Sequence, residues 1–543
     1  MQTKQNKKKI QKSWMQGLSR FFERGIFAPF LLAIQAVLYL YLINSAEVYV
    51  SESIRAIIVS LLLGGTILGL AYLLVRHWLK ASLIASLFIF LFFLFGDASD
   101  WVVDAFGLSL LQADLMVLEL VTIYMLLWIW LVQNRIKNIA SVNLYFNLLS
   151  VLLLIYSGIS VRNSELGNRI SIKRDTPASK VAGESVPRPD VYYIILDGYG
   201  RSDILQALYS FDDSDFLEGL KTRGFYIADE STSNYVQTML SVSSALNMNY
   251  LQSLKAEGAD LEDRRDLAAL LENSNVRNIL AQNGYQLVSF RNVSHVGISS
   301  AEIYYDDIGT GLAYPLSAFE SNVINRTLAR VLSHISFFNK VLIEMPYNTH
   351  RHQIQAALER LKNIPTMDGD YFVYAHILAP HPPFVFDENG EALFYDEPFT
   401  LSDGNNYIRG HSREEFIIGY RKQINYVNKI VLETVDAILA TSDPKPIIII
   451  QGDHGPGSHF DFTSLENTLP AERFSILNAY YFPDQDYSRL YPTISPINSF
   501  RVVLNQFFGG TYALIPDHHY YSTWSYPFNF VDVKDLSLSA IDQ

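Results

Sequence analysis

Four isoleucines near the end of the chain lead into a glycine-rich turn, in the stretch Pro446-Ile447-Ile448-Ile449-Ile450-Gln451-Gly452-Asp453-His454-Gly455-Pro456-Gly457. An apolar run that stops at a turn is typical of a strand buried on both faces. This strand ends at Asp453 and His454, and open α/β sheets bind their ligands at the carboxyl ends of strands. A carboxylate and an imidazole together are ligands for a divalent metal. The stretch therefore predicts an α/β sheet with a metal site at one edge.

A second apolar run ends in the same way, at Ile194-Ile195-Leu196-Asp197-Gly198. Taken alone, Asp197 has an alternative role as the N-cap of the next helix. Because another strand also ends in Asp, two carboxylates at one sheet edge can converge on one ion. We therefore interpret Asp197 as a second metal ligand.

A helix is expected to begin near Thr238, because the polar segment Ser231-Thr232-Ser233-Asn234 precedes it. A helix N-terminus offers free N–H groups and a favourable dipole to an anion. A threonine hydroxyl that also ligates a metal becomes a nucleophile. Thr238 is therefore the candidate nucleophile. The alternatives are a capping role for these hydroxyls, or one of three rival serines: Ser241, Ser243 and Ser244.

Three further histidines are candidates for contacting a substrate. His376 and His381 occur in and after a predicted strand, within Tyr374-Ala375-His376-Ile377-Leu378-Ala379-Pro380-His381-Pro382. Imidazoles in such a loop can bind a phosphoryl oxygen, protonate a leaving group or ligate a second metal. His459, five residues after His454, is the third candidate.

From Asp190 onward, apolar strands alternate with helices. The expected strands are Val191–Leu196, Phe225–Ala228, Leu287–Phe290, Tyr371–His376 and Pro446–Gln451, and the expected helices are Arg265–Leu271, Ser321–Ile343, Gln353–Lys362 and Glu414–Leu439. This alternation predicts a mainly parallel central sheet sandwiched by helices. We expect it to form one catalytic domain over residues 191–543.

The N-terminal third has the pattern of a membrane domain. Hydrophobic residues make up 49% of the 543 residues, and a spanning helix needs about 20 of them in succession. The apolar stretches before residue 161 are Ile26–Ile43, Ile54–Val75, Leu83–Phe95, Leu115–Val132 and Ile139–Ile159, of which the third is the shortest. They predict a membrane domain of about five helices over residues 1–160. A polar juxtamembrane linker with three prolines follows over residues 161–190.

Charge predicts the orientation and excludes some functions. Lysines and arginines gather at the N-terminus and near Arg76 and Arg135, whereas acidic residues such as Asp97 and Asp100 occur between them. The positive-inside rule then places the catalytic domain on the extracytoplasmic face of a bacterial-type cytoplasmic membrane. The net charge of −13 argues against nucleic-acid binding. The absence of cysteine excludes disulfides, thiolate metal sites and cysteine nucleophiles.

With these motifs in this order, the chain resembles the alkaline phosphatase/sulfatase superfamily. The apolar stretches make it similar to the membrane-anchored branch, which includes lipoteichoic acid synthases (phosphoglycerol transferases) and phosphoethanolamine transferases. The resemblance implies an alkaline phosphatase-like fold and His381 in contact with substrate phosphate. It also implies that Thr238 is the nucleophile and that four residues ligate the metal: Asp197, Thr238, Asp453 and His454. The chain departs from that branch in having Asp197 where Glu is usual, and Val236-Gln237-Thr238 in place of Asn-x-Thr.

The resemblance implies a metal-dependent membrane transferase. It would move a phospho-group, of phosphoglycerol or phosphoethanolamine type, from an outer-leaflet phospholipid to an envelope glycan or lipid. The group would pass through a phosphothreonine at Thr238, and His381 or His376 would protonate the leaving lipid alcohol. One divalent ion, Mn²⁺ or Zn²⁺, is expected; oxygen and imidazole ligands also admit Mg²⁺.

Two other classes of function remain open. One is hydrolysis by a membrane-tethered phosphodiesterase, phosphatase or sulfatase-like enzyme; a two-metal version would need ligands from His376, His381 and His459. A formylglycine sulfatase is disfavoured, since the chain has no cysteine and no Ser-x-Pro-x-Arg near Thr238. The other is a non-catalytic module that binds the envelope. A transporter is disfavoured because the spans lack paired intramembrane charges.

Overall fold

The computed structural model describes residues 17, 19–44, 50–166, 188–252, 264–293, 296–306 and 316–538. The chain forms two compact units, each drawn from separate stretches of sequence. The helical unit comprises Met1–Gly167, Thr310–Pro346 and Asp396–Pro398. The sheet unit comprises Asn168–Gly309, Tyr347–Tyr395 and Phe399–Gln543. Most of the expected linker at 161–190 lies outside the described residues.

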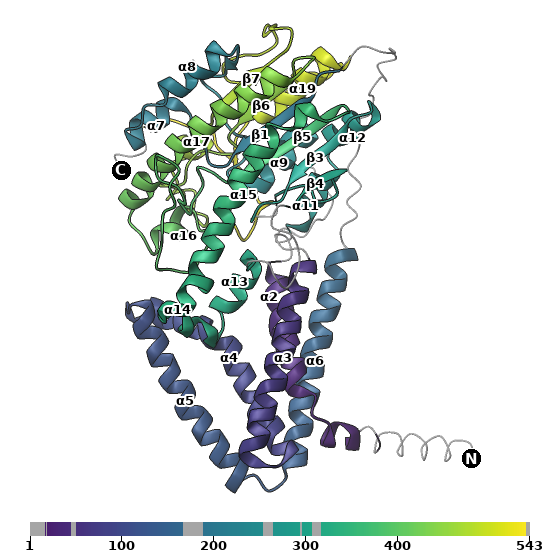
Figure 1. The fold of residues 1–543 in the computed structure, drawn as a ribbon, viewed down its shortest axis with the longest axis vertical. Helices are drawn as coiled ribbons and strands as arrows, with labels where there is room; N and C mark the ends of the chain where they lie inside the picture. Colours follow the sequence, from purple (N-terminus) through teal and green to yellow (C-terminus); the bar gives the residue numbers. More distant parts are fainter. Residues whose placement is uncertain are drawn as a thin grey trace, which may run out of the picture. The chain divides into compact units, whose positions relative to one another are not determined.

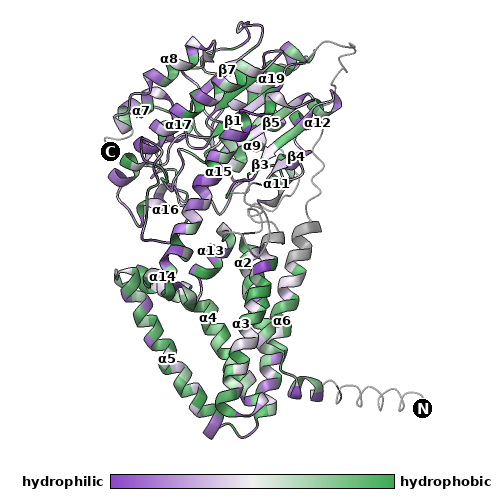
Figure 2. Ribbon diagram, in the orientation of Figure 1, coloured by the Kyte–Doolittle hydropathy of each residue, from purple (hydrophilic) through white to green (hydrophobic). Residues whose placement is uncertain are grey.

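Five apolar helices begin the helical unit (Figures 1 and 2): α2 (Ala28–Ile43), α3 (Val50–Val75), α4 (Trp78–Phe106), α5 (Leu110–Asn134) and α6 (Ile139–Leu166). Four of them, α3 to α6, are long and apolar enough to cross a membrane. The expected count of five such helices is therefore wrong for the described residues, because α2 has only 16 residues. At 1.5 Å per residue it spans about 24 Å, short of a hydrocarbon core of about 30 Å.

Helix α4 is the longest of the five, although the sequence suggested the shortest apolar stretch there. It has 29 residues and ends at Gly107, which has a left-handed φ of 65°. The helix continues beyond the apolar stretch through Asp97 and Asp100. These carboxylates pair with Arg326 (3.0 Å) and Arg330 (2.7 Å) of the same unit, so the polar end of α4 is satisfied.

The segment Thr310–Pro346, which we call the insert, belongs to the helical unit rather than to the expected domain over 191–543. The expected single helix Ser321–Ile343 is wrong. Four short elements replace it: α13 (Ala318–Asn325), η1 (Leu328–His334), α14 (Ser336–Asn339) and η2 (Lys340–Glu344). The chain breaks after α13, where the Arg326 carbonyl accepts a hydrogen bond from Gly96 N of α4 (3.0 Å).

A seven-stranded sheet forms the centre of the sheet unit, in the order β2-β7-β6-β1-β5-β3-β4. Its strands are β1 (Val191–Leu196), β2 (Tyr226–Ile227), β3 (Gln286–Phe290), β4 (Ile303–Tyr305), β5 (Tyr371–Ile377), β6 (Ile447–Gln451) and β7 (Asn478–Tyr481). The expected mainly parallel sheet is corrected to a mixed one, because β7 runs antiparallel to both β6 and β2. The other pairings are parallel.

Helices cover the sheet on both sides (Figure 1). The long ones are α15 (Met345–Leu361), α17 (Arg413–Thr441) and α19 (Pro496–Phe507), and α9 (Thr238–Asn247) carries the candidate nucleophile. The remaining elements are α7 (Ser202–Tyr209), α8 (Ser214–Thr222), α11 (Arg265–Glu272), α12 (Asn275–Gln282), η3 (Ile364–Thr366), α16 (Gly404–Ile408), α18 (Pro470–Phe474), β8 (Tyr520–Tyr521) and β9 (Val531–Asp532). Tyr193 and Ile195 of β1 share one buried cluster with Val242 and Leu246 of α9. This packing fixes α9 against the central strand.

Candidate active site

Three neighbouring strands bring their carboxyl ends to one edge of the sheet. Strand β1 lies between β5 and β6, and Ile195 is level with both His376 and Gln451. Asp197 follows β1, and Asp453 and His454 follow β6. Parallel pairing therefore places side chains together that are more than 250 positions apart in sequence.

Two glycines allow the backbone to turn at these strand ends. Gly198 has a positive φ of 73°, and its N–H donates to Asp453 Oδ1 (3.0 Å). A Cβ on Gly455 would lie 2.0 Å from the carbonyl oxygen of Glu472. A left-handed turn and a close backbone approach are both conformations that glycine permits, which explains the glycine after Asp197 and the one after His454.

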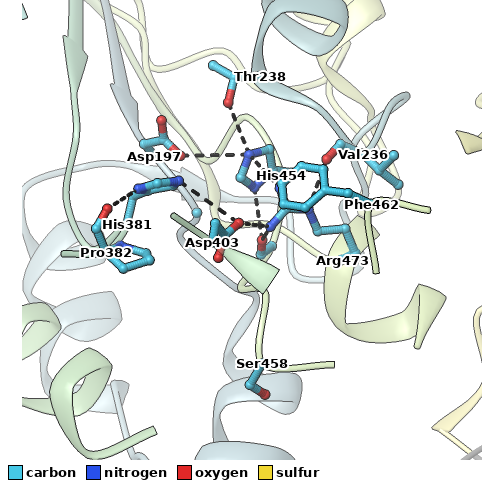
Figure 3. Close-up of polar contacts among 12 residues, drawn as sticks. Asp197, Val236, Thr238, His381, Pro382, Asp403, His454, Ser458, Phe462 and Arg473 are labelled. Carbon is cyan, nitrogen blue, oxygen red and sulfur yellow. Dashed lines mark hydrogen bonds and ion pairs between the residues drawn. The ribbon is translucent and has the colours of Figure 1, made fainter. Parts of the chain in front are cut away.

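Thr238 is the first residue of α9, and its hydroxyl faces His454 (Figure 3). The distance from Thr238 Oγ1 to His454 Nε2 is 3.1 Å. His454 Nδ1 lies 2.9 Å from the Gly455 carbonyl, so Nδ1 carries the proton and Nε2 offers a lone pair. Nε2 is also 3.2 Å from Asp453 Oδ2 and 3.7 Å from Asp197 Oδ1. The structure thus brings together the four residues predicted to ligate a metal.

A second imidazole, His376, lies on the other side of Asp197. Its Nε2 is 3.0 Å from Asp197 Oδ2. Ligand atoms of Asp197, His376 and Asp453 all lie within 4.8 Å of one another, in positions that could hold a metal ion. His376, which we expected to contact substrate, is fully buried here.

The donor set fits a divalent cation. One oxygen of each carboxylate, Asp197 Oδ1 and Asp453 Oδ2, is buried and has no hydrogen-bond partner among the described residues. A buried charged group that is not fully hydrogen-bonded is costly, and a cation bound between these two oxygens would remove that cost. Carboxylate and imidazole ligands suit Zn²⁺ and Mn²⁺, and they do not choose between them.

Two of the three rival serines use their hydroxyls in bonds to the backbone. Ser243 Oγ donates to the Leu267 carbonyl (3.2 Å), and Ser244 Oγ donates to the Ser241 carbonyl (2.8 Å). Both hydroxyls therefore satisfy the local backbone. Thr238, in contrast, is only partly buried, so a substrate can reach its hydroxyl.

The two remaining predicted histidines differ in placement. His381 lies beside Asp197, because its backbone N–H donates to the Asp197 carbonyl (3.0 Å). Its Nε2 faces Asp403 Oδ2 at 3.9 Å. His459 instead pairs with the buried Glu472, at 3.5 Å from Nδ1 to Oε2. The structure joins His381 to the candidate site but shows no contact of His459 with it among the described residues.

Two charged residues of the site were missed in the sequence. Arg473 is fully buried; it donates to Asp403 Oδ2 (2.7 Å) and to the Val236 carbonyl (2.9 Å), and its Nη2 lies 3.1 Å from His454 Nε2. Asp403 thereby links Arg473 to His381 (Figure 3). Neither residue follows a predicted strand or belongs to a recognisable spacing, so no local signal marks them.

Two further polar side chains lie around the histidines. The Asn292 amide is 3.3 Å from His376 Nδ1 and donates to the His376 carbonyl (3.1 Å), which holds the ring in place. His350 of α15 is buried, and neither of its ring nitrogens has a hydrogen-bond partner among the described residues. Burial first, and then His381, lower the pKa of His350 to about 3. It is therefore neutral at physiological pH.

Charges within the site favour ionised carboxylates and a neutral His454. Burial by itself raises the pKa of Asp197, but His381, His376 and His454 outweigh it and hold the pKa below its usual range. Burial also raises the pKa of Asp403, and Arg473 and His381 reverse this. Burial, followed by Arg473, lowers the pKa of His454. A cation would therefore meet acceptor groups already in their ligating forms.

These features define a class of α/β enzyme in which a hydroxyl at a helix N-terminus faces Asp and His ligands at a sheet edge. The sequence match agrees. The family model described as Sulfatase matches residues 181–492, more than half of the chain, and the chain belongs to this family. The expectation of an enzyme of the alkaline phosphatase/sulfatase superfamily is confirmed. No curated protein matches the chain.

Solved structures that match the chain include an integral membrane protein, a periplasmic domain and a putative sulfatase. The integral membrane protein lipooligosaccharide phosphoethanolamine transferase A from Neisseria meningitidis is 13% identical, with 88% of this chain and 95% of that chain covered and a TM-score of 0.41. The C-terminal periplasmic domain of EcEptC from Escherichia coli, in complex with Zn, is 12% identical, with 64% and 94% covered and a TM-score of 0.39. The putative sulfatase yidJ from Bacteroides fragilis is 14% identical, with 61% and 76% covered and a TM-score of 0.37.

Proposed function

We propose that this chain is a metal-dependent membrane phosphotransferase that uses Thr238 as its nucleophile. The observation that carries the proposal is the position of the Thr238 hydroxyl. It lies at the start of α9, 3.1 Å from His454 Nε2, beside Asp197 and Asp453, each of which has one buried carboxylate oxygen without a hydrogen-bond partner among the described residues. When bound, a divalent ion would lower the pKa of that hydroxyl and offset charge on phosphoryl oxygens. Asp197, Asp453, His454 and either Thr238 or His376 would hold it.

The residues then have distinct roles in a two-step transfer. Thr238 Oγ1, whose proton goes to water, forms a bond to phosphorus as the bond from phosphorus to the lipid alcohol breaks. We assign to His381 the proton that the departing lipid oxygen receives, with Asp403 orienting its ring. In the second step an acceptor hydroxyl gives its proton to His381 and attacks the phosphothreonine, and Thr238 Oγ1 leaves and takes a proton back from water. The N–H groups at the start of α9 orient the phosphoryl group in both steps.

The donor we propose is a phospholipid of the outer leaflet, with a phosphoglycerol or phosphoethanolamine head group. Helices α3 to α6 are long enough to cross a membrane. Arg76 begins the turn between α3 and α4, and Arg135 begins the turn between α5 and α6, so both turns are basic. The positive-inside rule puts these turns in the cytoplasm and the end of α6 outside. The sheet unit, which follows α6, would then be extracytoplasmic and close to lipid donors. The acceptor would be an envelope glycan or lipid.

The test uses the full chain in vesicles that contain head-group-labelled phosphatidylethanolamine or phosphatidylglycerol. With a metal present and no acceptor, we expect release of diacylglycerol and a phospho-adduct on the peptide that contains Thr238. Thr238→Ala should abolish both products, whereas Ser243→Ala, on the same helix, should retain them. An adduct that persists in Thr238→Ala would overturn the nucleophile. Labelled free head-group phosphate without transfer to any supplied glycan would favour the hydrolase, and metal counting per chain would separate one ion from two.

A further inference from the structure

The insert binds the helical unit through several polar contacts at one end of the bundle. Glu320 of α13 forms an ion pair with Arg55 of α3. Arg330 of η1 donates to Asp100 of α4 (2.7 Å) and to Asp114 of α5 (2.7 Å). His334 Nε2 lies 2.9 Å from Asp114 Oδ2. Both Arg330 and Asp114 are buried, so the insert is a fixed part of this unit.

Close packing of backbone and apolar side chains adds to these contacts. A Cβ on Gly96 of α4 would lie 2.3 Å from the Asn325 carbonyl, so glycine permits the end of α13 to approach α4. Leu328 and Val331 of η1 pack against a buried cluster made by α4 and α5, whose members are Phe95, Val102, Ala113 and Val117. One side of the insert is thereby buried against two spanning helices.

The other side of the insert exposes apolar side chains. Leu332 is 37% exposed and Ile335 is 50% exposed. Both residues lie within five positions of the buried Arg330. Unless another surface covers them, their side chains contact water. On α4, Trp101 and Phe106 are 64% and 59% exposed. Exposed apolar side chains therefore occur both at the end of α4 and on the part of the insert that packs beside α4 and α5.

Helix length places this surface at a definite depth. Residues Trp78 to Gly96 of α4 cover about 28 Å at 1.5 Å per residue, close to the thickness of the hydrocarbon core. Asp97 and Asp100, which bind the insert, come directly after that length. The insert therefore lies at the boundary between acyl chains and head groups, where exposed tryptophan and phenylalanine are also typical.

We propose that the insert is an interfacial membrane anchor, in which Leu332 and Ile335 enter the outer boundary of the lipid bilayer. The occupant of this apolar surface is the bilayer itself, because the insert packs directly against α4 and α5, two helices that are long and apolar enough to cross a membrane. The insert interrupts the sequence of the sheet unit, which resumes at Tyr347.

Single-cysteine labelling tests the anchor, and the natural chain contains no cysteine. Three isoleucines of comparable exposure form a matched set: Ile335 of η1's C-terminal flank (50%), Ile123 of α5 (64%) and Ile418 of α17 in the sheet unit (46%). Each is changed to cysteine in the full chain and labelled with an environment-sensitive fluorophore. The proteins are then placed in phosphatidylcholine nanodiscs, with or without lipids that carry a nitroxide near the head group. Iodide is the aqueous quencher.

The anchor predicts that nitroxide lipids quench the label at position 335 at least about twofold more than the label at 418, with reduced quenching by iodide. Position 123 reports the bilayer interior, and Leu332→Cys provides a second site if the label at 335 disturbs folding. Equal responses at 335 and 418 would overturn the proposal. Protection from both quenchers at 335 would also overturn it, because it would show that protein, such as a second copy of the chain, covers this surface.

Discussion

Two regions of the molecule bury the same kinds of side chain but differ in how those side chains are partnered. In the helical unit, Arg330 donates to Asp100 and Asp114 through Nε, Nη1 and Nη2. In the sheet unit, two buried carboxylate oxygens, Asp197 Oδ1 and Asp453 Oδ2, have no hydrogen-bond partner among the described residues. A buried charge that is satisfied within the chain is a structural element, whereas one that is left open awaits a ligand. The two regions therefore differ in whether the buried charged groups have partners within the chain, and not in the types of residue that they bury.

The largest effect is expected from removing the charge of Asp453, whose Oδ2 has no hydrogen-bond partner among the described residues. Asp453→Asn keeps an oxygen that can accept the bond from Gly198 N but loses the charge that a metal needs. We expect kcat/KM for transfer to fall by at least about 10³-fold, with loss of bound metal and no loss of stability in the metal-free protein. The measurement is lipid turnover together with metal content. Asp436→Asn, which changes a surface pair with Arg223, is the control; normal turnover in Asp453→Asn would contradict the contrast.

In the helical unit, removing a buried charge should lower the stability of the protein. Arg330→Ala leaves Asp114 buried without its cation, and removing one partner of a buried pair costs about 3–5 kcal/mol. Hydrogen exchange in η1 and α13 should report this loss as faster exchange. Arg326→Ala breaks the exposed pair with Asp97 and should cost about 0–1 kcal/mol. Equal effects of the two changes would show that burial of the Arg330 pair is not what holds the insert.

Much of the candidate site could be predicted because it depends on local patterns. Asp197, Asp453 and His454 follow apolar strands, and Thr238 follows a helix-start signal, so periodicity alone locates them. Asp403 and Arg473 could not be found in this way, since their contact joins segments that are 70 residues apart. His376 was expected to contact substrate or to ligate a second metal, and sequence does not show that its ring faces Asp197.

The fold was predictable to a similar extent. Strands β1, β3, β5 and β6 are long apolar runs, and they were expected at nearly their observed positions. Strand β7, which makes the sheet mixed, follows a segment without a clear turn signal and was missed. The insert was expected to be one helix, because its apolar spacing is helical. The break at Arg326 arises from its backbone contact with Gly96, 230 positions earlier in the chain, which no local pattern reveals.

A metal should stabilise the sheet unit and leave the insert unaffected. At about 100 times its dissociation constant, Mn²⁺ or Zn²⁺ should add about 2.7 kcal/mol to the free energy of unfolding. Chelation should reverse this gain, as followed by thermal unfolding of the sheet unit. His459→Ala should keep the response, because His459 pairs with Glu472. His376→Ala should reduce it. A gain of equal size in all three proteins would exclude His376 as a ligand and leave Thr238 as the fourth one.

The smallest effect concerns the partly buried carboxylate of Asp190, whose loss of hydration is only partly offset by a hydrogen bond. Asp190 precedes β1 and accepts a hydrogen bond from Tyr371 N (2.8 Å). Burial raises the pKa of Asp190, the hydrogen bond from Tyr371 N opposes this, and the negative charge of Asp370 adds to it. The resulting pKa is about 6. Its unfolded value is near 4, so the folded protein holds the proton more tightly. The sheet unit therefore loses stability as pH rises from about 4 to about 6, and the loss is complete above that window.

Asp190→Asn should remove this dependence, since an amide oxygen can still accept from Tyr371 N. Near pH 3 the variant and the natural protein should unfold at similar temperatures, because Asp190 is then mostly protonated in both the folded and the unfolded state. At pH 8 the variant should be more stable by about 1–3 kcal/mol. Asp370→Asn removes a neighbouring charge and should give a smaller gain with the same sign. A variant that gains stability near pH 3 but not at pH 8 would show that Asp190 is stabilised as a carboxylate, and Asp190 would then belong with the satisfied charges of the helical unit.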